Sequence, residues 1–401
     1  MTEGAVLRVG FLFNHYFPHQ VPHAAPYAFE LSRHYPEIDV IVACSSRQEM
    51  DLVVTIGKLY PGHRCQFRTL RIPWYYSMID PVVSLWAFGR KRAVLRNNLP
   101  FFRGLDALVS PERNCLDLRT VHGLTNLVMI RTRHGAGDRD GVFDERLTGF
   151  QFMLLPGQKY ADRLHELGLL QEGRFCASGY PKFEVIRGLN REIPRLFDND
   201  NPVVVYNPHF DRSQSSWGPM GLQILEWFLH HREFNLIFAP HVVLFKRRIR
   251  HGAFLPGKYR LAPNIHVDTG SSASVDMTYM LAADIYLGDV SSQVYEFLLE
   301  PRPCIFLNGH HVAWQGNPSY QHWRLGQVVE NVESELIDAL KQAFKTHSGY
   351  IKRQREAFAY AFYSEPETTA AERGARAIAD FLNLKAGRFS SSPGKTTMRG
   401  L

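Results

Sequence analysis

Short, nearly uninterrupted apolar stretches recur along the first half of the chain, separated by longer segments with apolar positions at helical spacing. The stretches are rich in Val, Ile, Leu and Phe, which is typical of strands buried on both faces of a parallel sheet. They predict strands at residues 7–14, 40–43, 107–110, 127–131 and 152–155. The segments between them predict helices at residues 24–34, between 81 and 97, and from residue 160.

The same pattern starts again after residue 202. It predicts strands at residues 203–206, 236–239, 265–267, 285–287 and 304–307, with helices at 222–230, 274–282 and 292–299. Beyond residue 332 the pattern is helical, including residues 333–345 and 368–383. Strands that alternate with helices in this way indicate an α/β fold.

A polar segment with two prolines, LNREIPRLFDNDNP, separates the two halves and is the best place for a hinge. A chain of 401 residues is also long for one ordinary core. We therefore predict domains at residues 1–188 and 189–365. A crossover helix is expected at 366–384, and a disordered basic tail at 385–401.

Composition narrows the class of protein. The chain is 45% hydrophobic, which excludes a disordered chain, and it lacks the roughly 18 consecutive apolar residues of a membrane-spanning helix. Lys and Arg exceed Asp and Glu by 46 − 39 = +7, which suits an anionic partner. The five cysteines are scattered and the N-terminus lacks the order of a signal peptide, so we expect a cytoplasmic protein.

The most informative motif is Asp289-Val290-Ser291-Ser292, which follows a predicted strand and opens a predicted helix. Hydroxyls and free backbone N–H groups at the start of a helix suit a phosphate group. Simple capping of the helix by the same side chains is an equally good interpretation of the spacing. No G-x-x-x-x-G-K-[ST] loop is present, nor a G-x-G-x-x-G after the first strand, which argues against ATP hydrolysis and ordinary NAD binding.

This segment, with Glu296 and Arg302-Pro303 behind it, resembles the TDYSS motif of the CDP-glycerol glycerophosphotransferase family, which includes teichoic acid polymerases and primases. Four further blocks resemble that family in the right order: Arg133-His134-Gly135, Gly179-Tyr180-Pro181-Lys182, Tyr206-Asn207-Pro208 and Ala239-Pro240-His241. Together the blocks cover roughly residues 125–310. Gly288 and Val290 stand where the family has Thr and Tyr, and Ala-Gly-Asp-Arg follows His134-Gly135 in place of Thr-Pro-Leu-Lys. These departures leave the alcohol specificity open.

The resemblance implies a GT-B fold: two Rossmann-like domains with a cleft between them and C-terminal helices crossing back. It implies an enzyme that transfers a phosphoalcohol, such as glycerol phosphate, from a CDP-linked donor to a hydroxyl. The acceptor would be a cell-surface polymer or a lipid-linked molecule.

The resemblance also implies roles for particular residues. His134, after a buried strand and before a Gly-rich turn, would be the general base, and His241 would bind the donor phosphates. The expected donor-binding residues are Asp289, Ser291, Ser292, Glu296, Pro208 and His209. Further candidates are Gly135, Arg139, Lys182, Ser216, Trp217 and Arg302.

Asp138-Arg139-Asp140 imitates a metal-binding D-x-D motif. It lies in a Gly-rich loop of a chain whose other motifs resemble a GT-B family, where side chains and a helix dipole commonly meet the leaving-group charge. We expect no metal, no cofactor other than the nucleotide-linked donor, and no nucleic-acid partner.

Aromatic and apolar residues from Trp74 to Phe88 lead into the basic cluster Arg90-Lys91-Arg92. This order suits the surface of a bilayer, so peripheral attachment to the inner face of the cell membrane is one interpretation. A buried interdomain helix explains the apolar part equally well.

Two other functions fit the same sequence. One is a GT-B nucleotide-sugar glycosyltransferase or an enzyme like the UDP-sugar 2-epimerases, which would share the cleft and the phosphate site. The other is a non-catalytic GT-B-like module that binds a polymer or a partner protein.

Overall fold

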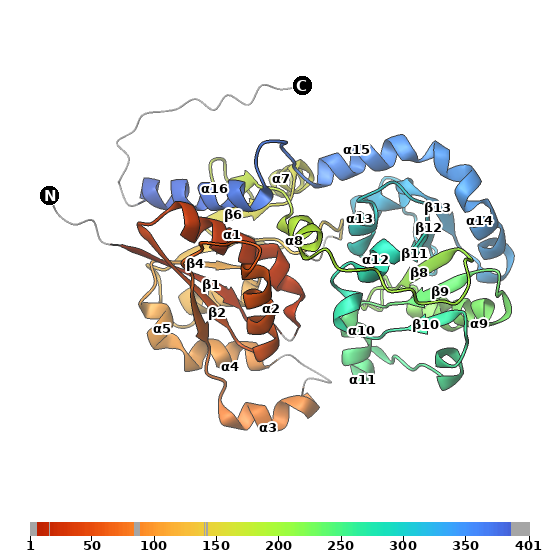
Figure 1. Ribbon diagram of the computed structural model, residues 1–401, viewed down its shortest axis with the longest axis horizontal. Coiled ribbons are helices and arrows are strands. Elements are labelled where there is room, and N and C mark those ends of the chain that lie inside the picture. Colours follow the sequence, from red (N-terminus) through yellow and green to blue (C-terminus); the bar gives the residue numbers. More distant parts are fainter. Residues whose placement is uncertain (1–5, 16, 84–88, 140, 142, 386–401) are drawn as a thin grey trace.

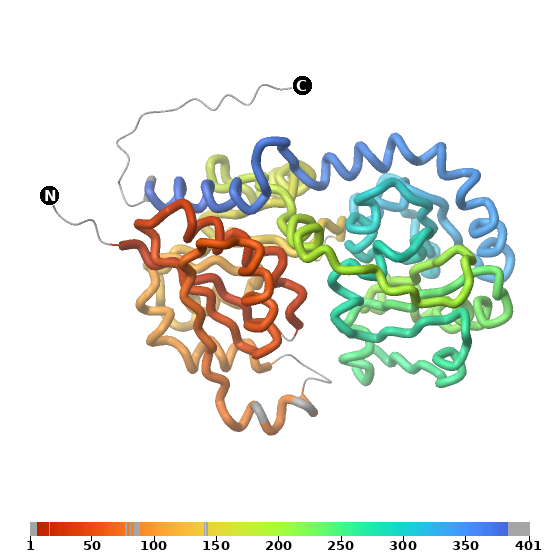
Figure 2. The backbone as a smooth tube through the Cα atoms, viewed as in Figure 1, coloured from red at the N-terminus to blue at the C-terminus, as the bar shows by residue number. Residues whose placement is uncertain are grey.

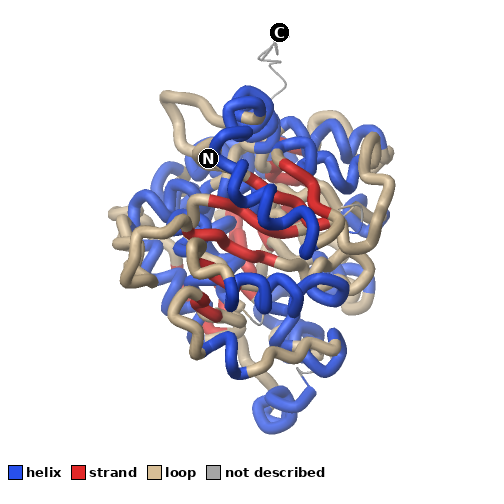
Figure 3. The backbone as a smooth tube through the Cα atoms, turned by 90° about the vertical axis from the view of Figure 1, so that its right-hand side faces the viewer, coloured by secondary structure: helices blue, strands red, loops and turns tan. Residues whose placement is uncertain are grey.

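Two parallel sheets lie side by side in the computed structural model, which describes residues 6–385 apart from residues 16, 84–88, 140 and 142 (Figure 1). Helices surround the strands of both sheets (Figure 3). The segment 190–202 contains no helix or strand and leads from the first sheet to the second (Figure 2).

The first sheet has seven strands in the order β3-β2-β1-β4-β5-β6-β7, all parallel. Their bounds are β1 (Leu7–Phe13), β2 (Ile38–Cys44), β3 (Gln66–Thr69), β4 (Ala107–Ser110), β5 (Val128–Arg131), β6 (Phe152–Leu155) and β7 (Phe175–Ala177). The helices of this part of the chain are α1 (Val21–His34), α2 (Arg47–Gly57), α3 (Trp74–Val83), α4 (Arg90–Asn97), α5 (Leu99–Arg103), α6 (Asp117–Thr120), α7 (Gln158–Glu166) and α8 (Pro181–Leu189).

The second sheet has six parallel strands in the order β10-β9-β8-β11-β12-β13. Their bounds are β8 (Val203–Asn207), β9 (Asn235–Phe238), β10 (Ile265–Val267), β11 (Ile285–Gly288), β12 (Cys304–Leu307) and β13 (Gln327–Val329). The helices are α9 (Leu222–His230), α10 (Val242–Lys246), α11 (Arg248–His251), α12 (Thr278–Ala282), α13 (Gln293–Phe297), α14 (Val332–Thr346) and α15 (Ile351–Ala361).

The last described helix, α16 (Ala370–Lys385), returns to the first domain and packs on α1. Ala371, Ala375 and Ile378 of α16 are buried in the same apolar cluster as Val9 and Phe11 of β1. Residues near the end of the described chain therefore complete the core of the first domain. Two parallel-sheet domains with a helix crossing back confirm the expected fold class.

The apolar stretches predict the strands correctly because these strands are buried. Val9, Phe11, Leu12 and Phe13 of β1 are each at most 1% exposed, because packed elements cover both faces of the sheet. All ten predicted strands are present, with ends within two residues of the predicted ones.

The strands that the pattern did not predict lie at sheet edges. β3 is polar and exposed along its length, while β7 and β13 are three residues long. An edge strand has one neighbour and needs few apolar residues, so it leaves little trace in the hydrophobic pattern.

Some predicted helices differ in extent. Within residues 274–282 only Thr278–Ala282 is α-helical, and a 3-10 turn precedes it. Within 81–97, α3 ends at Val83 and α4 begins at Arg90, and residues 84–88 lie outside the described part of the chain. The expected tail from residue 386 also lies outside the described residues. No helix in the described part of the chain has the length and apolar character needed to cross a membrane.

Candidate active site

A cavity of about 370 Å³ lies between the two domains, at the carboxyl ends of strands from both sheets. Parallel sheets commonly bind ligands at this edge, because the loops that follow the strands converge there. The first domain contributes His15, His19, His23, Arg113, Arg133, His134, Gly135, Gly137, Arg139, Gly141, Tyr160, Tyr180 and Lys182 to its wall. The second contributes His209, Phe210, His241, Val242, Val243, Arg247, Val275, Val290, Ser291, Ser292, Gln293 and Glu296.

His134 lies in the loop that follows β5. Its ring centroid is 5.7 Å from that of His19 and 6.4 Å from that of His23. Burial lowers the pKa of His134 to about 3, and the nearby charge of Glu112 opposes part of this shift. The imidazole is therefore neutral at physiological pH and can accept a proton.

His241 follows β9 and caps α10. Its Nδ1 accepts a hydrogen bond from the backbone N–H of Val243 at 3.2 Å, so the proton of the neutral ring is on Nε2. Burial lowers the pKa of His241 to about 3, and Arg139 adds to the shift. His241 is therefore a neutral N–H donor on the wall of the cavity.

Asp289 supports the second domain's side of the cavity from behind. This buried carboxylate accepts hydrogen bonds from the backbone N–H groups of His209 (3.0 Å), Ser216 (2.6 Å) and Val290 (2.6 Å). The Ser216 hydroxyl donates another at 2.8 Å. Asp289 thus ties the loop after β8 to the end of β11, and it does not line the cavity.

Ser291 and Ser292 do line the cavity, as expected for a phosphate site. Helix α13 begins one residue later, and the Ser292 side chain makes no capping hydrogen bond to it. Gly135 of the first domain approaches this turn closely. Its φ of +97° favours glycine, and a Cβ there would lie 2.9 Å from the Ser292 Oγ.

Lys182 and Glu296 form a buried ion pair between the domains. Lys182 Nζ, on α8, lies 2.7 and 2.8 Å from the two carboxylate oxygens of Glu296, on α13. The Tyr180 hydroxyl donates to the same carboxylate at 2.8 Å. Glu296 is one of the expected donor-binding residues, and in the structure its carboxylate also connects the two domains.

Arg139 extends across the cleft from the first domain. Its guanidinium contacts the His209 ring, lies 3.6 Å from a carboxylate oxygen of Asp211 and 5.7 Å from the Phe210 ring centroid. A cation in this position could contact an anionic ligand held by the second domain.

Four other predicted residues are not among the cavity residues: Pro208, Ser216, Trp217 and Arg302. The Pro208 carbonyl accepts the backbone N–H of His241 at 2.9 Å, and Trp217 stacks on Phe238 with centroids 5.1 Å apart. Arg302 donates to two carbonyl oxygens, each at 2.6 Å. These side chains support the loops around the cavity.

Asp138, in the D-x-D sequence, connects the domains. Lys159 Nζ lies 2.6 Å from one of its oxygens, while His322 Nδ1 (2.8 Å) and the Tyr295 hydroxyl (3.0 Å) contact the other. Although burial opposes ionisation, Lys159 and His322 hold the pKa of Asp138 well below its usual value. Both oxygens are already engaged, so this carboxylate fits a structural role better than metal binding.

Several cavity residues were missed by the sequence analysis. His15, His19 and His23 come from the segment between β1 and the first turn of α1. His15 and His23 are buried and His19 is half-buried, and loss of solvent lowers the pKa of all three. The available signal was their position after the carboxyl end of a central strand, together with the four-residue spacing of His19 and His23.

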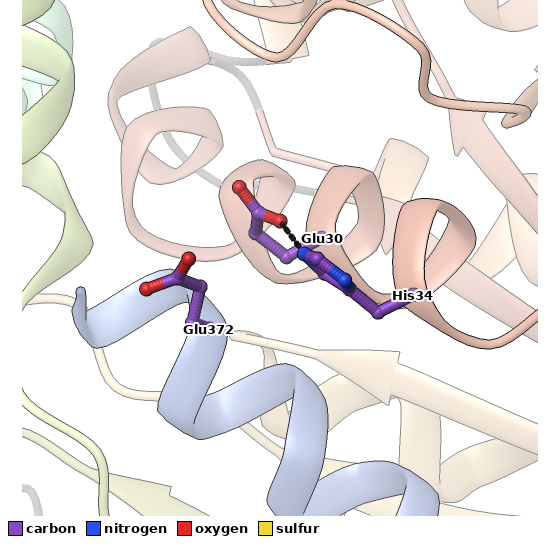
Figure 4. Close-up of side chains that lie close together, drawn as sticks. All are labelled: Glu30, His34 and Glu372. Carbon is purple, nitrogen blue, oxygen red and sulfur yellow. Dashed lines mark ion pairs between the residues drawn. The ribbon is translucent and has the colours of Figure 1, made fainter. Parts of the chain in front are cut away.

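One group of described residues has ligand atoms close enough to share a metal ion: Glu30, His34 and Glu372 (Figure 4). These side chains lie on α1 and α16 and do not line the cavity. Glu30 pairs with Arg33 at 2.8 Å and His34 at 3.0 Å, and Glu372 accepts the Thr369 backbone N–H at 2.8 Å. The group therefore has local partners at the junction of the two helices.

Comparisons with known proteins identify the fold. No family model matches the chain, and no curated protein matches its sequence. A structure of the wall teichoic acid polymerase TagF, soaked with CDPG, matches with a TM-score of 0.57 and 15% identity, over 95% of this chain and 89% of that one.

Epimerase structures match to a comparable degree. A protein from Listeria monocytogenes assigned as a UDP-N-acetylglucosamine 2-epimerase has a TM-score of 0.58 and 12% identity, covering 96% of this chain and 98% of its own. The UDP-GlcNAc 2-epimerase from Neisseria meningitidis, bound to UDP-GlcNAc, has a TM-score of 0.52 and 13% identity, covering 94% and 99%. These similarities are structural, and they show that this chain has the two-domain GT-B fold that the family resemblance implies.

Proposed function

We propose that this chain is a transferase that moves a phosphoalcohol from a CDP-linked donor to the hydroxyl group of an acceptor. The observation that carries the proposal is that His134 of the first domain and His241 of the second line one cavity together with Ser291 and Ser292. Four of the five motifs that resemble the glycerophosphotransferase family contribute His134, His241, both serines, Lys182 and Glu296 to its wall.

The charge of the cavity wall favours a diphosphate. The arginines of the wall are Arg113, Arg133, Arg139 and Arg247, and Glu296 is the only acid among its described residues. Lys182 and Tyr180 already contact that acid. A ligand with negative charge would therefore meet N–H and O–H donors on several sides.

In the proposed reaction the acceptor oxygen attacks the phosphorus atom that carries the alcohol. The new P–O bond forms as the bond to the bridging oxygen of the diphosphate breaks, and CMP leaves. His134 takes the proton of the acceptor hydroxyl. The Nε2–H of His241 and the hydroxyls of Ser291 and Ser292 donate to oxygens on which negative charge increases.

Transfer assays with CDP-glycerol and related CDP-alcohols test this mechanism. We expect His134→Ala and His241→Ala each to lower kcat by about 100-fold or more, the usual scale for loss of an acid–base or charge-stabilising group. His165→Ala, which changes an exposed histidine on α7, is the matched control and should retain activity. Activity of both cavity variants within about threefold of the wild type would end the mechanism.

An epimerase-like or glycosyltransferase activity on a UDP-sugar is the second candidate. It is favoured by the epimerase structures, which match this chain with TM-scores comparable to that of TagF. A thermal-shift series with CMP, CDP, CDP-glycerol, UDP and UDP-GlcNAc separates the two. Stabilisation by the cytidine compounds supports the transferase, and stabilisation by the uridine compounds alone supports the second candidate.

We also propose that α3 attaches the protein to an anionic membrane surface. Trp74, Met78 and Val82 of this helix are 74%, 71% and 65% exposed. Beside it, a groove of about 940 Å³ is lined by Tyr75, Tyr76, Arg92 and Arg96, among others. Exposed apolar side chains next to arginines suit the boundary between head groups and acyl chains.

A further inference from the structure

The half-buried carboxylate of Glu112 contacts the amide of Gln20, and this amide contacts His134; neither residue belongs to a motif. Glu112 lies just after the end of β4, and Gln20 precedes α1, so both belong to the first domain. We propose that Glu112 and Gln20 are positioning residues that hold His134 in the tautomer with an unprotonated Nε2. The role of this tautomer in catalysis rests on the proposed function. The position of the ring proton itself does not depend on it.

The first step concerns the charge on Glu112. Its carboxylate lies 2.9 Å from Lys91 Nζ and 3.6 Å from His15 Nε2. Although burial opposes ionisation, Lys91 and the neighbouring groups keep the pKa of Glu112 below its ordinary value. An ionised carboxylate can only accept hydrogen bonds.

This charge fixes the orientation of the Gln20 amide. The amide atom 2.6 Å from Glu112 Oε1 must be the nitrogen, because the amide oxygen would face another acceptor. The same nitrogen lies 3.5 Å from His134 Nε2. An NH₂ group can only donate, so Nε2 is the acceptor and the ring proton is on Nδ1.

The second ring nitrogen of His134, Nδ1, makes no hydrogen bond within the described part of the chain that would favour the opposite tautomer. His134 Nδ1 is buried and has no hydrogen-bond partner among the described residues. The tautomer is therefore set from the Nε2 side. A contact of 3.5 Å is also at the outer limit of a hydrogen bond, so an acceptor hydroxyl can replace it at little cost.

Proton transfer to Nε2 would create a cation in a buried place. The negative charge of Glu112 stabilises that cation, whereas the charges of Arg133, Arg131 and Lys91 oppose it. The other titratable groups that face the ring or this carboxylate are the imidazoles of His15, His19 and His23. Glu49 is also nearby and accepts the His15 backbone N–H at 2.7 Å, but the charge of Glu112 acts most strongly on His134.

Nitrogen-15 NMR of the full chain with labelled histidines measures the tautomer directly, with His134→Asn used to assign the signals. At pH 7.5 we expect His134 to carry its proton mainly on Nδ1, because the opposite tautomer would turn its Nε2–H toward the NH₂ donor of Gln20. Gln20→Met should remove this preference and give a mixture or the opposite tautomer. Gln293→Met, which changes an amide of the second domain, is the matched control and should leave the His134 tautomer unchanged.

A proton on Nε2 in the wild type, or an unchanged tautomer in Gln20→Met, would overturn the inference. If Gln20→Met does not fold, Glu112→Gln serves instead and should also weaken the preference, because a neutral amide no longer fixes the orientation of Gln20. In the transfer assay Glu112→Gln should lower kcat more than it changes KM and move the acidic limb of the pH profile to lower pH. An Nδ1–H tautomer without any transfer activity would refute the proposed function and leave the positioning inference intact.

Discussion

The protonation state of the histidines in this protein depends strongly on their surroundings. Six of them, His15, His19, His23, His134, His209 and His241, line the cavity, and burial lowers the pKa of each. Each neutral ring can serve as a donor and an acceptor of hydrogen bonds. The site therefore presents uncharged polar groups near pH 7, with its positive charge supplied mainly by arginines.

This burial predicts that acid destabilises the protein. A histidine has a pKa near 6.5 when the chain is unfolded and a lower one in the fold, so the unfolded state binds more protons below pH 6.5. The contribution to stability is complete above pH 6.5 and is lost as the pH falls. Between pH 7.5 and 5.5 we expect the free energy of unfolding to drop by about 1.4 kcal/mol for each of His134 and His241.

Urea unfolding at the two pH values measures this change. The double variant His134→Asn/His241→Asn should lose part of the pH dependence, because two imidazoles with lowered pKa values are gone. Equal unfolding free energies of the wild type at pH 7.5 and 5.5 would contradict the assignment of neutral rings.

At the scale of elements, short helices carry the contact between the domains. Helices α8 and α13 meet through Lys182 and Glu296, whose side chains are 3% and 6% exposed. The loop after β5 contacts the turn before α13, where Gly135 and Gly137 leave room for Ser292. The position of Ser291 and Ser292 in the cavity therefore depends on elements of the other domain.

The ion pair gives a prediction for these two helices. Lys182→Met leaves the Glu296 carboxylate buried without its cation, which should lower stability by about 3–5 kcal/mol. In the double variant Lys182→Met/Glu296→Gln the uncompensated charge is gone, so most of that loss should be recovered. Thermal unfolding of the wild type, both single variants and the double variant measures the coupling, and a single variant as stable as the double one would argue against it.

At the scale of the whole molecule, the first domain is completed by a helix from the end of the described chain, and α3 extends from its opposite side (Figure 1). The exposed apolar residues of α3 face away from both cores, because Trp74, Met78 and Val82 remain mostly accessible. The proposed attachment therefore places α3 at the membrane surface, with these side chains toward the lipid.

Co-sedimentation with vesicles of anionic phospholipid tests that attachment. Replacing Trp74, Met78 and Val82 together by Ser should lower binding at least about tenfold, because each apolar side chain buried in lipid contributes roughly 1.5–3 kcal/mol. Leu261→Ser, which changes a leucine that is 86% exposed on the second domain, is the control and should bind like the wild type. Undiminished binding of the triple variant would exclude α3 as the attachment site.

The sequence by itself determined the α/β class, the ten strands that are buried in the sheets and the motifs that follow β5, β9 and β11. It did so because a strand covered on both faces must be continuously apolar, and the loop after such a strand must emerge at the carboxyl edge of the sheet. Only the tertiary structure decided which of these polar residues reach the cavity. Asp289 and Arg302 resemble ligand-binding residues in the sequence, yet they hold loops and carbonyl oxygens in place. His19 lines the cavity, and Gln20 and Glu112 connect to His134, although none of the three belongs to a motif. Pairing between side chains more than ninety residues apart depends on how the strands are ordered and how the domains meet, and no local pattern of residues encodes that geometry.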